Sequence, residues 1–235
     1  LDNSKVFFSS DMMVHARPDN HVVVKMLSDR TASLEMGIGL ETQNYHVGDG
    51  SVLMRIEGHE FEKAFATSVM TSVPGTTAEQ KTGMPTQART GTTNSNNSFA
   101  GGVTDGRSMV GAFDLNKAQA YSTIRANKSY FFHDDIYGFM GSGIRQDGTV
   151  NGEIWTTLNQ VERRTDVTYN VGSGNVVVPL GRNSVRNFND IEKPVWFFQD
   201  GFGYIIVPQS PIDLKMWAEV RTGSWRLVNS RDSAS

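Results

Sequence analysis

The chain has 235 residues, a formal net charge of −3 and no cysteine. The length allows one large domain or two small ones, and the missing cysteines exclude disulfides, thiol nucleophiles and cysteine-based metal sites. The negative charge argues against nucleic-acid binding, which needs a basic surface, so a site for a polyanion has to be a local cluster of Arg and Lys.

An abundance of turn-forming residues predicts many short strands. There are 23 glycines and 7 prolines, and hydrophobic residues make up 38% of the chain, which is enough for a packed core. In chain order, apolar or alternating runs predict strands at residues 21–27, 51–57, 130–140, 175–180, 195–208 and 214–220. Residues 59–66 carry a helix signal, and it is a short one. We find no apolar run long enough to cross a membrane.

Asp-Gly pairs punctuate these runs, and this dipeptide readily adopts the positive φ angles of tight hairpin turns. They are Asp49-Gly50, Asp105-Gly106, Asp147-Gly148 and Asp200-Gly201. The clearest predicted hairpin spans residues 196–206, and residues 86–98 predict a long exposed loop because they are poor in apolar side chains. Without a fixed repeat or a composition shift, the pattern predicts one large antiparallel sandwich.

Motifs for the common catalytic centres are missing: there is no nucleophile elbow, phosphate-binding loop, dinucleotide fingerprint or zinc-protease helix. The five histidines do not pair at metal-ligand spacing. His21 lies at a strand edge and is interpreted as structural. The run 133–135 (His-Asp-Asp) fits either part of a metal site or an exposed turn, and the turn is favoured.

The best polar cluster of the chain combines Glu41, Asn44, His46 and Asp49 in one glycine-containing segment. A turn between two strands is the simpler interpretation of this segment, and a glycosidase-type carboxylate pair stays open because sequence alone does not place two carboxylates at the required separation. The aromatic residues of the 196–204 run fit either sugar stacking or a core, and their alternation favours the core.

A series of short motifs runs along nearly the whole chain in a fixed order: Phe8-Ser9-Ser10-Asp11-Met12-Met13-Val14-His15, Gly48-Asp49-Gly50, Val73-Pro74-Gly75-Thr76-Thr77, Ser98-Phe99-Ala100-Gly101-Gly102, Lys128-Ser129-Tyr130-Phe131-Phe132, Gly141-Ser142-Gly143-Ile144, Thr156-Thr157-Leu158-Asn159-Gln160, Asp200-Gly201-x-Gly203-Tyr204 and Arg221-Thr222-Gly223-Ser224-Trp225. In this order they resemble polysaccharide lyase family 8, the hyaluronate, chondroitin and xanthan lyases.

The resemblance implies an all-β fold, a large antiparallel super-sandwich of the galactose-mutarotase-like kind. Residues 1–235 are then expected to form the central β-sandwich of a lyase, incomplete at its end. An N-terminal α/α-toroid catalytic domain and a C-terminal β domain of the family are expected to be absent from the chain. The start, Leu1-Asp2-Asn3-Ser4, does not resemble a natural N-terminus, which fits an excised or processed piece.

The resemblance also implies a function. Family members cleave uronic-acid-containing glycosaminoglycans such as chondroitin and hyaluronan by β-elimination, and this chain is expected to form one wall of the substrate cleft. The main acid and base groups are expected on the α/α-toroid domain, the partner of this sandwich, so neither His15 nor His46 is assigned as the base. The implied protein is bacterial, secreted or periplasmic, and its partner is an acidic polysaccharide, with neither nucleic acid nor membrane.

A glutamate before Gly-Asp-Gly supports catalysis in the family, and Glu41 is its nearest match here. An ungapped alignment places Leu40 at that site, with Glu41 one residue further on. The resemblance implies that Asn44, Gln87 and Arg89 line the substrate cleft. Some members bind a divalent cation such as calcium near the sandwich, but the sequence offers no convincing ligand set, and no metal is assigned.

Two other functions fit the same sequence. One is a non-catalytic carbohydrate-binding or scaffold β-sandwich of the same ancestry, and the other is a subunit that pairs with a separate toroid chain. The lyase and the subunit predict a large exposed apolar face for docking, whereas the binding module predicts a closed sandwich with a polar surface.

Overall fold

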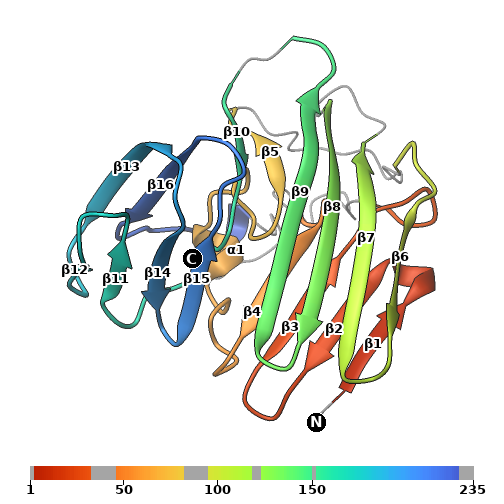
Figure 1. Cartoon of the computed structure of the whole chain (residues 1–235), viewed down its shortest axis with the longest axis horizontal. Helices are drawn as coiled ribbons and strands as arrows, with labels where there is room; N and C mark the ends of the chain where they lie inside the picture. The colour runs from red at the N-terminus through yellow and green to blue at the C-terminus, as the bar shows by residue number, and fades with distance from the viewer. Residues whose placement is uncertain (1–2, 33–45, 82–94, 118–122, 150–151, 228–235) are drawn as a thin grey trace. The chain divides into compact units, whose positions relative to one another are not determined.

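The computed structural model describes residues 3–32, 46–81, 95–117, 123–149 and 152–227. Its contacts divide the chain into two compact units (Figure 1). Unit 1 comprises residues 1–160 and 223–235, and unit 2 comprises residues 161–222. Both units consist mainly of antiparallel strands, which confirms the predicted all-β class. Among the described residues, no helix is long and apolar enough to span a membrane.

The first sheet of unit 1 is a simple meander of neighbouring antiparallel strands, in which alternate side chains are buried. It contains β1 (Asn3–Phe7), β2 (Met12–Ala16), β3 (His21–Lys25) and β4 (Ser51–Arg55), with a 3-10 turn, η1 (Phe8–Ser10), between the first two. Ser51 pairs with Lys25 at one end of this sheet, and Arg55 pairs with His21 at the other.

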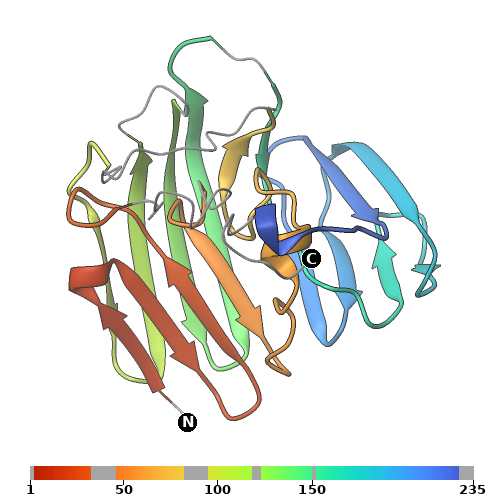
Figure 2. The same cartoon turned by 180° about the vertical axis from the view of Figure 1, so that it is seen from behind.

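The second sheet of unit 1 is a longer meander of β6 (Ala100–Thr104), β7 (Ser108–Asn116), β8 (Ile124–His133) and β9 (Ile136–Gln146). Figures 1 and 2 show that it faces the first sheet as a second layer. Met13, Val22 and Val24 of one sheet and Phe113, Tyr130 and Phe132 of the other are almost fully buried between them. Gly111 allows this close approach, because a Cβ there would lie 2.1 Å from Met13 Sδ.

The remaining elements of unit 1 are short. They are α1 (Ala64–Thr67), the strand pair β5 (Thr77–Glu79) with β10 (Ile154–Thr156), and η2 (Trp225–Leu227), which contacts α1. The helix predicted at residues 59–66 is therefore wrong in extent. Hydrogen bonds from the backbone N–H groups of residues 56, 57 and 58 to the Glu60 carboxylate fix a turn before α1 instead.

Unit 2 is a smaller assembly with its own core. One sheet has the order β12 (Val176–Val178), β11 (Val167–Asn170), β14 (Val195–Gln199), β15 (Phe202–Ile206), and a separate pair joins β13 (Ser184–Ile191) to β16 (Ile212–Ala218). Tyr169 is buried and packs against Phe188 and Phe197. Phe197 is thus a core residue, as alternation favours, whereas Phe198 is 48% exposed.

Most predicted strands coincide with observed ones, but the single strand predicted at 130–140 is wrong. The chain reverses at Asp134, whose φ is 49°, so that β8 and β9 form a hairpin. The run 133–135 is therefore the turn that the sequence favours over a metal element. Asp105-Gly106 and Asp200-Gly201 form hairpin turns as predicted, whereas Asp147-Gly148 follows β9 and leads to no hairpin.

Candidate functional site

The residues predicted to support catalysis or line the cleft, Glu41, Asn44, Gln87 and Arg89, lie outside the described residues. Glu41 and Asn44 belong to residues 33–45, and Gln87 and Arg89 belong to residues 82–94. The described residues that flank these two ranges lie at one end of unit 1. We call these flanking residues the 26–32 stem, the 46–50 stem and the 95–100 stem. We call the end of unit 1 that carries the three stems the stem end.

Two stems that are far apart in the sequence are fastened together. The backbone N–H of Asp29 donates to Asn97 O at 2.9 Å, and that of Ser95 donates to Ser28 O at 3.4 Å. Arg30 adds two side-chain hydrogen bonds, from Nη1 to Ser98 O at 2.9 Å and from Nη2 to Ala100 O at 2.7 Å. The 26–32 and 95–100 stems are therefore held side by side.

The Asp11 carboxylate binds the 26–32 stem through side-chain hydrogen bonds. This carboxylate is fully buried and accepts hydrogen bonds of 2.6 Å from Ser28 Oγ, Thr31 Oγ1 and Arg30 Nη2. Burial opposes ionisation of Asp11, but these hydrogen bonds outweigh it and hold the pKa of the carboxyl below its usual value. The backbone of Asp11 has a φ of 50°, a left-handed conformation that Asp and Asn tolerate better than most residues.

Asp49, in the 46–50 stem, is a second buried carboxylate at this end. Its Oδ2 lies 2.8 Å from Lys117 Nζ and 2.9 Å from His46 Nδ1, and all three side chains are at most 3% exposed. Burial opposes ionisation, yet Lys117 and His46 lower the pKa of Asp49 below its usual value. Burial also lowers the pKa of His46, so a neutral imidazole with its proton on Nδ1 donates to the carboxylate.

Lys117 joins this cluster to the 95–100 stem. It forms an isolated antiparallel bridge with Ser95, whose Oγ donates to Asn116 O at 2.8 Å. Asn96 N also donates to Asn116 O. The carboxylate of Asp49 thus connects, through one ion pair, the residues that follow 33–45 in the sequence with the residues that follow 82–94.

A second buried lysine, Lys128, lies near Asp49. Lys128 Nζ donates to Gly75 O and to Thr77 Oγ1, and through them it holds the Pro-Gly-Thr-Thr turn against β8. Burial lowers the pKa of Lys128 to about 8, although the charge of Asp49 acts in the opposite direction.

Gly50 has a φ of 87°, and a Cβ at this position would lie 2.7 Å from Phe113 and 2.8 Å from Tyr130. Glycine is therefore required directly after Asp49.

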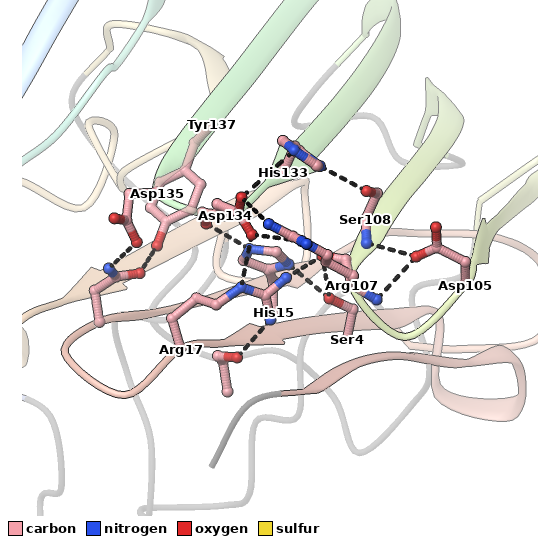
Figure 3. Close-up of polar contacts among 12 residues, drawn as sticks. Ser4, His15, Arg17, Asp105, Arg107, Ser108, His133, Asp134, Asp135 and Tyr137 are labelled. Atoms are coloured by element: carbon pink, nitrogen blue, oxygen red, sulfur yellow. Dashed lines mark hydrogen bonds and ion pairs between the residues drawn. The ribbon is translucent and has the colours of Figure 1, made fainter.

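The other end of unit 1 has a polar cluster of a different kind (Figure 3). His15 is buried between Ser4 Oγ, 2.7 Å from Nδ1, and Asp134 O, 2.8 Å from Nε2. Because a carbonyl only accepts, Nε2 carries the proton and Nδ1 accepts from Ser4. Arg107 binds the Asp134 carboxylate through two hydrogen bonds of 3.0 and 2.7 Å, which lower the pKa of Asp134. This cluster links the two sheets.

A serine, a histidine and an aspartate also meet here, but their geometry does not form a nucleophile. Ser108 Oγ lies 2.7 Å from His133 Nδ1, whereas His133 Nε2 lies 3.5 Å from Asp134 Oδ2, which is beyond hydrogen-bond distance. Arg107 already occupies that carboxylate. The two histidines that the sequence did not assign as bases, His15 and His46, are buried and not available to a polysaccharide in this structure.

No group of His, Asp or Glu side chains in the part of the chain that the structure describes is arranged to hold a metal ion. Near β5, Gln80 Oε1 accepts from Thr71 Oγ1 at 2.8 Å and Gln80 Nε2 donates to Thr71 O, while the buried Glu79 carboxylate pairs with Lys81 Nζ at 2.9 Å. The structural divalent cation, such as calcium, that the resemblance implies for some family members stays an expectation for this chain.

The polar stem end on an antiparallel sandwich can be compared with known proteins. The model of polysaccharide lyase family 8, super-sandwich domain, matches residues 2–235. The chain belongs to this family. The resemblance inferred from the motifs is thereby confirmed, and so is the super-sandwich fold.

Proteins that bear the names of lyases are similar to this chain over nearly its whole length. The chain is 28% identical over 228 residues to chondroitinase-AC of Pedobacter heparinus, covering 97% of this chain and 30% of that protein. It is 27% identical to a hyaluronate lyase of Thermasporomyces composti, covering 96% of this chain and 28% of that protein. The chain thus spans less than a third of the length of these two relatives.

Solved structures agree with the fold. A chondroitinase AC lyase superposes with a TM-score of 0.87 at 25% identity, covering all of this chain and 32% of that one. A xanthan lyase of Paenibacillus superposes with a TM-score of 0.76 at 24% identity, covering all of this chain and 22% of that one.

Sequence reasoning pointed to Asp49 through its polar segment and through Gly-Asp-Gly, but it missed Lys117, Arg30 and Asp11 as parts of one structure. Lys117 directly follows β7 in the sequence and belongs to no recognisable motif. Its partner becomes visible only once the two sheets are stacked.

Proposed function

We propose that this chain is the sandwich part of a lyase that cleaves uronic-acid-containing glycosaminoglycans, chondroitin or hyaluronan, by β-elimination. In this proposal the stem end of unit 1 forms one wall of the substrate cleft. The main acid and base groups are supplied by an α/α-toroid domain. The protein acts outside the cytoplasm of a bacterium, where such polymers are met.

The arrangement of the stems is the observation that carries this proposal. Glu41 and Asn44 follow the 26–32 stem in the sequence, and Gln87 and Arg89 precede the 95–100 stem. The backbone hydrogen bonds between Ser28 and Ser95 and between Asp29 and Asn97 fasten these two stems together. The structure thus supports one functional region formed by two ranges that are distant in sequence.

The printed names of the relatives support the reaction and the substrate class. Chondroitinase-AC and hyaluronate lyase are both named for glycosaminoglycans. Since these proteins are more than three times as long as the matched segment, they have room for the groups that the described residues do not offer. This division of labour agrees with the burial of His15 and His46.

β-Elimination sets the chemical roles. The uronate carboxylate is neutralised, the C5 proton is removed by a base, and the 4-linked oxygen leaves with a proton from an acid, so that an unsaturated uronate is formed. Neutralising the carboxylate stabilises the charge that develops on the enolate-like intermediate. Glu41 is proposed to orient groups of the toroid, and Asn44, Gln87 and Arg89 are proposed to contact the sugar chain.

The exposed apolar surface of β9 favours the lyase over a free-standing binding module. Ile136 is 72% exposed, Met140 is 64% exposed and Ile144 is 44% exposed, whereas Phe139 packs edge-on against the buried ring of Tyr130. A closed module with a polar surface would not leave a row of large apolar side chains in water. The row is the kind of surface that another domain would cover.

The test is a lyase assay on the protein as its gene encodes it, with any flanking domains, using chondroitin sulfate and hyaluronan. Formation of the conjugated unsaturated uronate is followed by its ultraviolet absorbance. We expect activity on at least one polymer, and Glu41→Gln to lower kcat by about tenfold through misplacement of its partners. Asp19→Asn, an exposed carboxylate at the other end of unit 1, is the matched control and should leave kcat unchanged.

Absence of product with every uronan would rule out the lyase. Saturable binding of chondroitin sulfate without turnover would then favour the carbohydrate-binding module. Full activity in Glu41→Gln would leave the lyase assignment standing and remove the role of Glu41.

A further inference from the structure

Asp49 occupies the point at which the sequence-distant parts of the stem end converge. Asp49 lies in the 46–50 stem, and its ion-pair partner Lys117 directly follows the last residue of β7. The backbone of Lys117 pairs in turn with Ser95 of the 95–100 stem. Both contacts of Asp49, to Lys117 Nζ and to His46 Nδ1, are made through Oδ2. One carboxylate oxygen therefore fixes the relative position of three chain segments.

Stability alone does not account for an ion pair this deeply buried. Removing two charges from water costs about as much as their attraction returns, and hydrophobic pairs of similar volume often serve equally well. The best-attested use of such a pair is to select one arrangement of the surrounding chain over its neighbours. A buried charge pair has a single low-energy partner geometry, whereas apolar contacts tolerate small slips.

The surroundings of the pair leave Asp49 little freedom to move. Gly50 follows it with a φ of 87° and is packed against Phe113 and Tyr130. Ser51 Oγ donates to Val47 O at 2.5 Å and closes the turn that contains Asp49. On the other side, Asn96 N and Ser95 Oγ both donate to Asn116 O, next to Lys117. Each partner of the ion pair is thus fixed to one stem.

We propose that Asp49 is a positioning residue of the lyase site, and that its ion pair with Lys117 sets the register of the 46–50 stem against the 95–100 stem. The proposal rests on the proposed function. It assigns the ion pair to substrate binding and turnover, because the ranges that contain Asn44 and Arg89 adjoin these two stems in the sequence.

The decisive variants separate positioning from stability. Asp49→Asn leaves the Lys117 charge buried without its counter-charge, so we expect the melting temperature to fall by roughly 10 °C. The double variant Asp49→Asn with Lys117→Met removes both charges, so most of that loss should be recovered. If the pair positions the site, kcat/KM on chondroitin sulfate falls by about ten- to a hundredfold in both variants.

The control pair lies at the other end of unit 1. Asp134→Asn removes the carboxylate that Arg107 binds, in an exposed setting, and Asn tolerates the positive φ of this position. We expect kcat/KM in this variant to equal that of the unchanged protein. All variants are made in the protein as its gene encodes it, and melting is followed by circular dichroism.

The outcomes separate the two proposals. An unchanged protein that produces no unsaturated uronate overturns the lyase itself. An active protein whose double variant regains both its melting temperature and its kcat/KM overturns the positioning role and leaves the lyase intact. Support requires a double variant that melts near the unchanged protein while its kcat/KM stays low. If Asp49→Asn alone does not fold, the double variant decides the question.

Discussion

Asp49 and Lys117 are 68 positions apart in the sequence, yet Asp49 Oδ2 and Lys117 Nζ lie 2.8 Å apart with both side chains at most 3% exposed. Arg107 and Asp134 make a contact of 2.7 Å at the other end of unit 1, but their side chains are 69% and 42% exposed. The same kind of pair therefore has different consequences. The exposed pair is well solvated, whereas the buried pair cannot lose one member without leaving a charge in the core.

His46 gives the first prediction, a loss of stability at mildly acidic pH. Its pKa is lowered in the folded protein, chiefly by burial, so the unfolded chain binds the proton first as pH falls below about 6.5. Unfolding is therefore favoured as pH decreases from 6.5. Urea unfolding at a series of pH values should show this slope, and His46→Gln should reduce it. Equal slopes in the two proteins would contradict the burial argument.

Asp49 adds to the acid loss at lower pH. Its folded pKa lies below the usual value, so its contribution is present above about pH 4 and is lost as pH falls through the folded pKa.

Lys128 predicts a gain of stability on the alkaline side. Its folded pKa is about 8, whereas the usual pKa of a lysine is 10.5, so the unfolded chain binds more protons between these values, and stability rises with pH in this window. The full difference corresponds to about 3 kcal/mol. In Lys128→Met this rise should be missing, and the free energy of unfolding of the two proteins is compared by urea titration from about pH 8 to pH 10.5, the interval between the two pKa values.

The comparison with Lys128→Met isolates this one group. Burial also lowers the pKa of Lys25 and Lys117 and raises the pKa of Tyr130, but these effects are common to both proteins and cancel in the difference. A difference between the two proteins that stays constant with pH would show that Lys128 does not titrate in this window.

Gly50 predicts a large effect from a single methyl group. Gly50→Ala places a Cβ against Phe113 and Tyr130 at a φ of 87°, so both overpacking and backbone strain act. We expect a loss of about 3 kcal/mol in the free energy of unfolding. Gly106→Ala is the control: it has a φ of 91° with nothing within 4 Å of the new Cβ, and should lose about 1 kcal/mol from strain alone. Equal losses would mean that packing around Gly50 is loose.

How far the sequence predicts this fold follows from the range of the interactions involved. The hairpin at Asp200-Gly201 is local, and turn chemistry together with flanking apolar residues predicts it correctly. The β8–β9 hairpin was predicted as one strand, because Asp134-Asp135 lacks glycine and apolar residues continue on both sides. Asp134 adopts the positive φ itself, supported by the hydrogen bonds from Arg107.

The site shows the same limit. The polar segment with Asp49 was visible in the sequence, but its ion pair depends on two sheets stacking so that residues 49 and 117 meet. Likewise, Arg30 reaches Ser98 and Ala100 only because the 26–32 and 95–100 stems pair. No periodicity marks such contacts in advance. The roles of Glu41, Asn44, Gln87 and Arg89 stay predictions, since these residues lie outside the described ones.

Arg30 provides the last prediction, which concerns local opening of the stem end. Its guanidinium joins the buried Asp11 carboxylate to Ser98 O and Ala100 O. Its removal leaves that carboxylate with the hydrogen bonds from Ser28 and Thr31 but without this ion pair, so some global stability is lost as well. The local opening of the two stems should become easier. We expect Arg30→Ala to accelerate amide hydrogen exchange at Asp29 and Ser95 by about tenfold, measured by mass spectrometry on short peptides. Arg107→Ala removes a more exposed arginine, 69% against 42%, at the other end of unit 1, and should leave exchange at these two amides unchanged. If both variants accelerate it equally, the effect is global, and Arg30 does not fasten the stems.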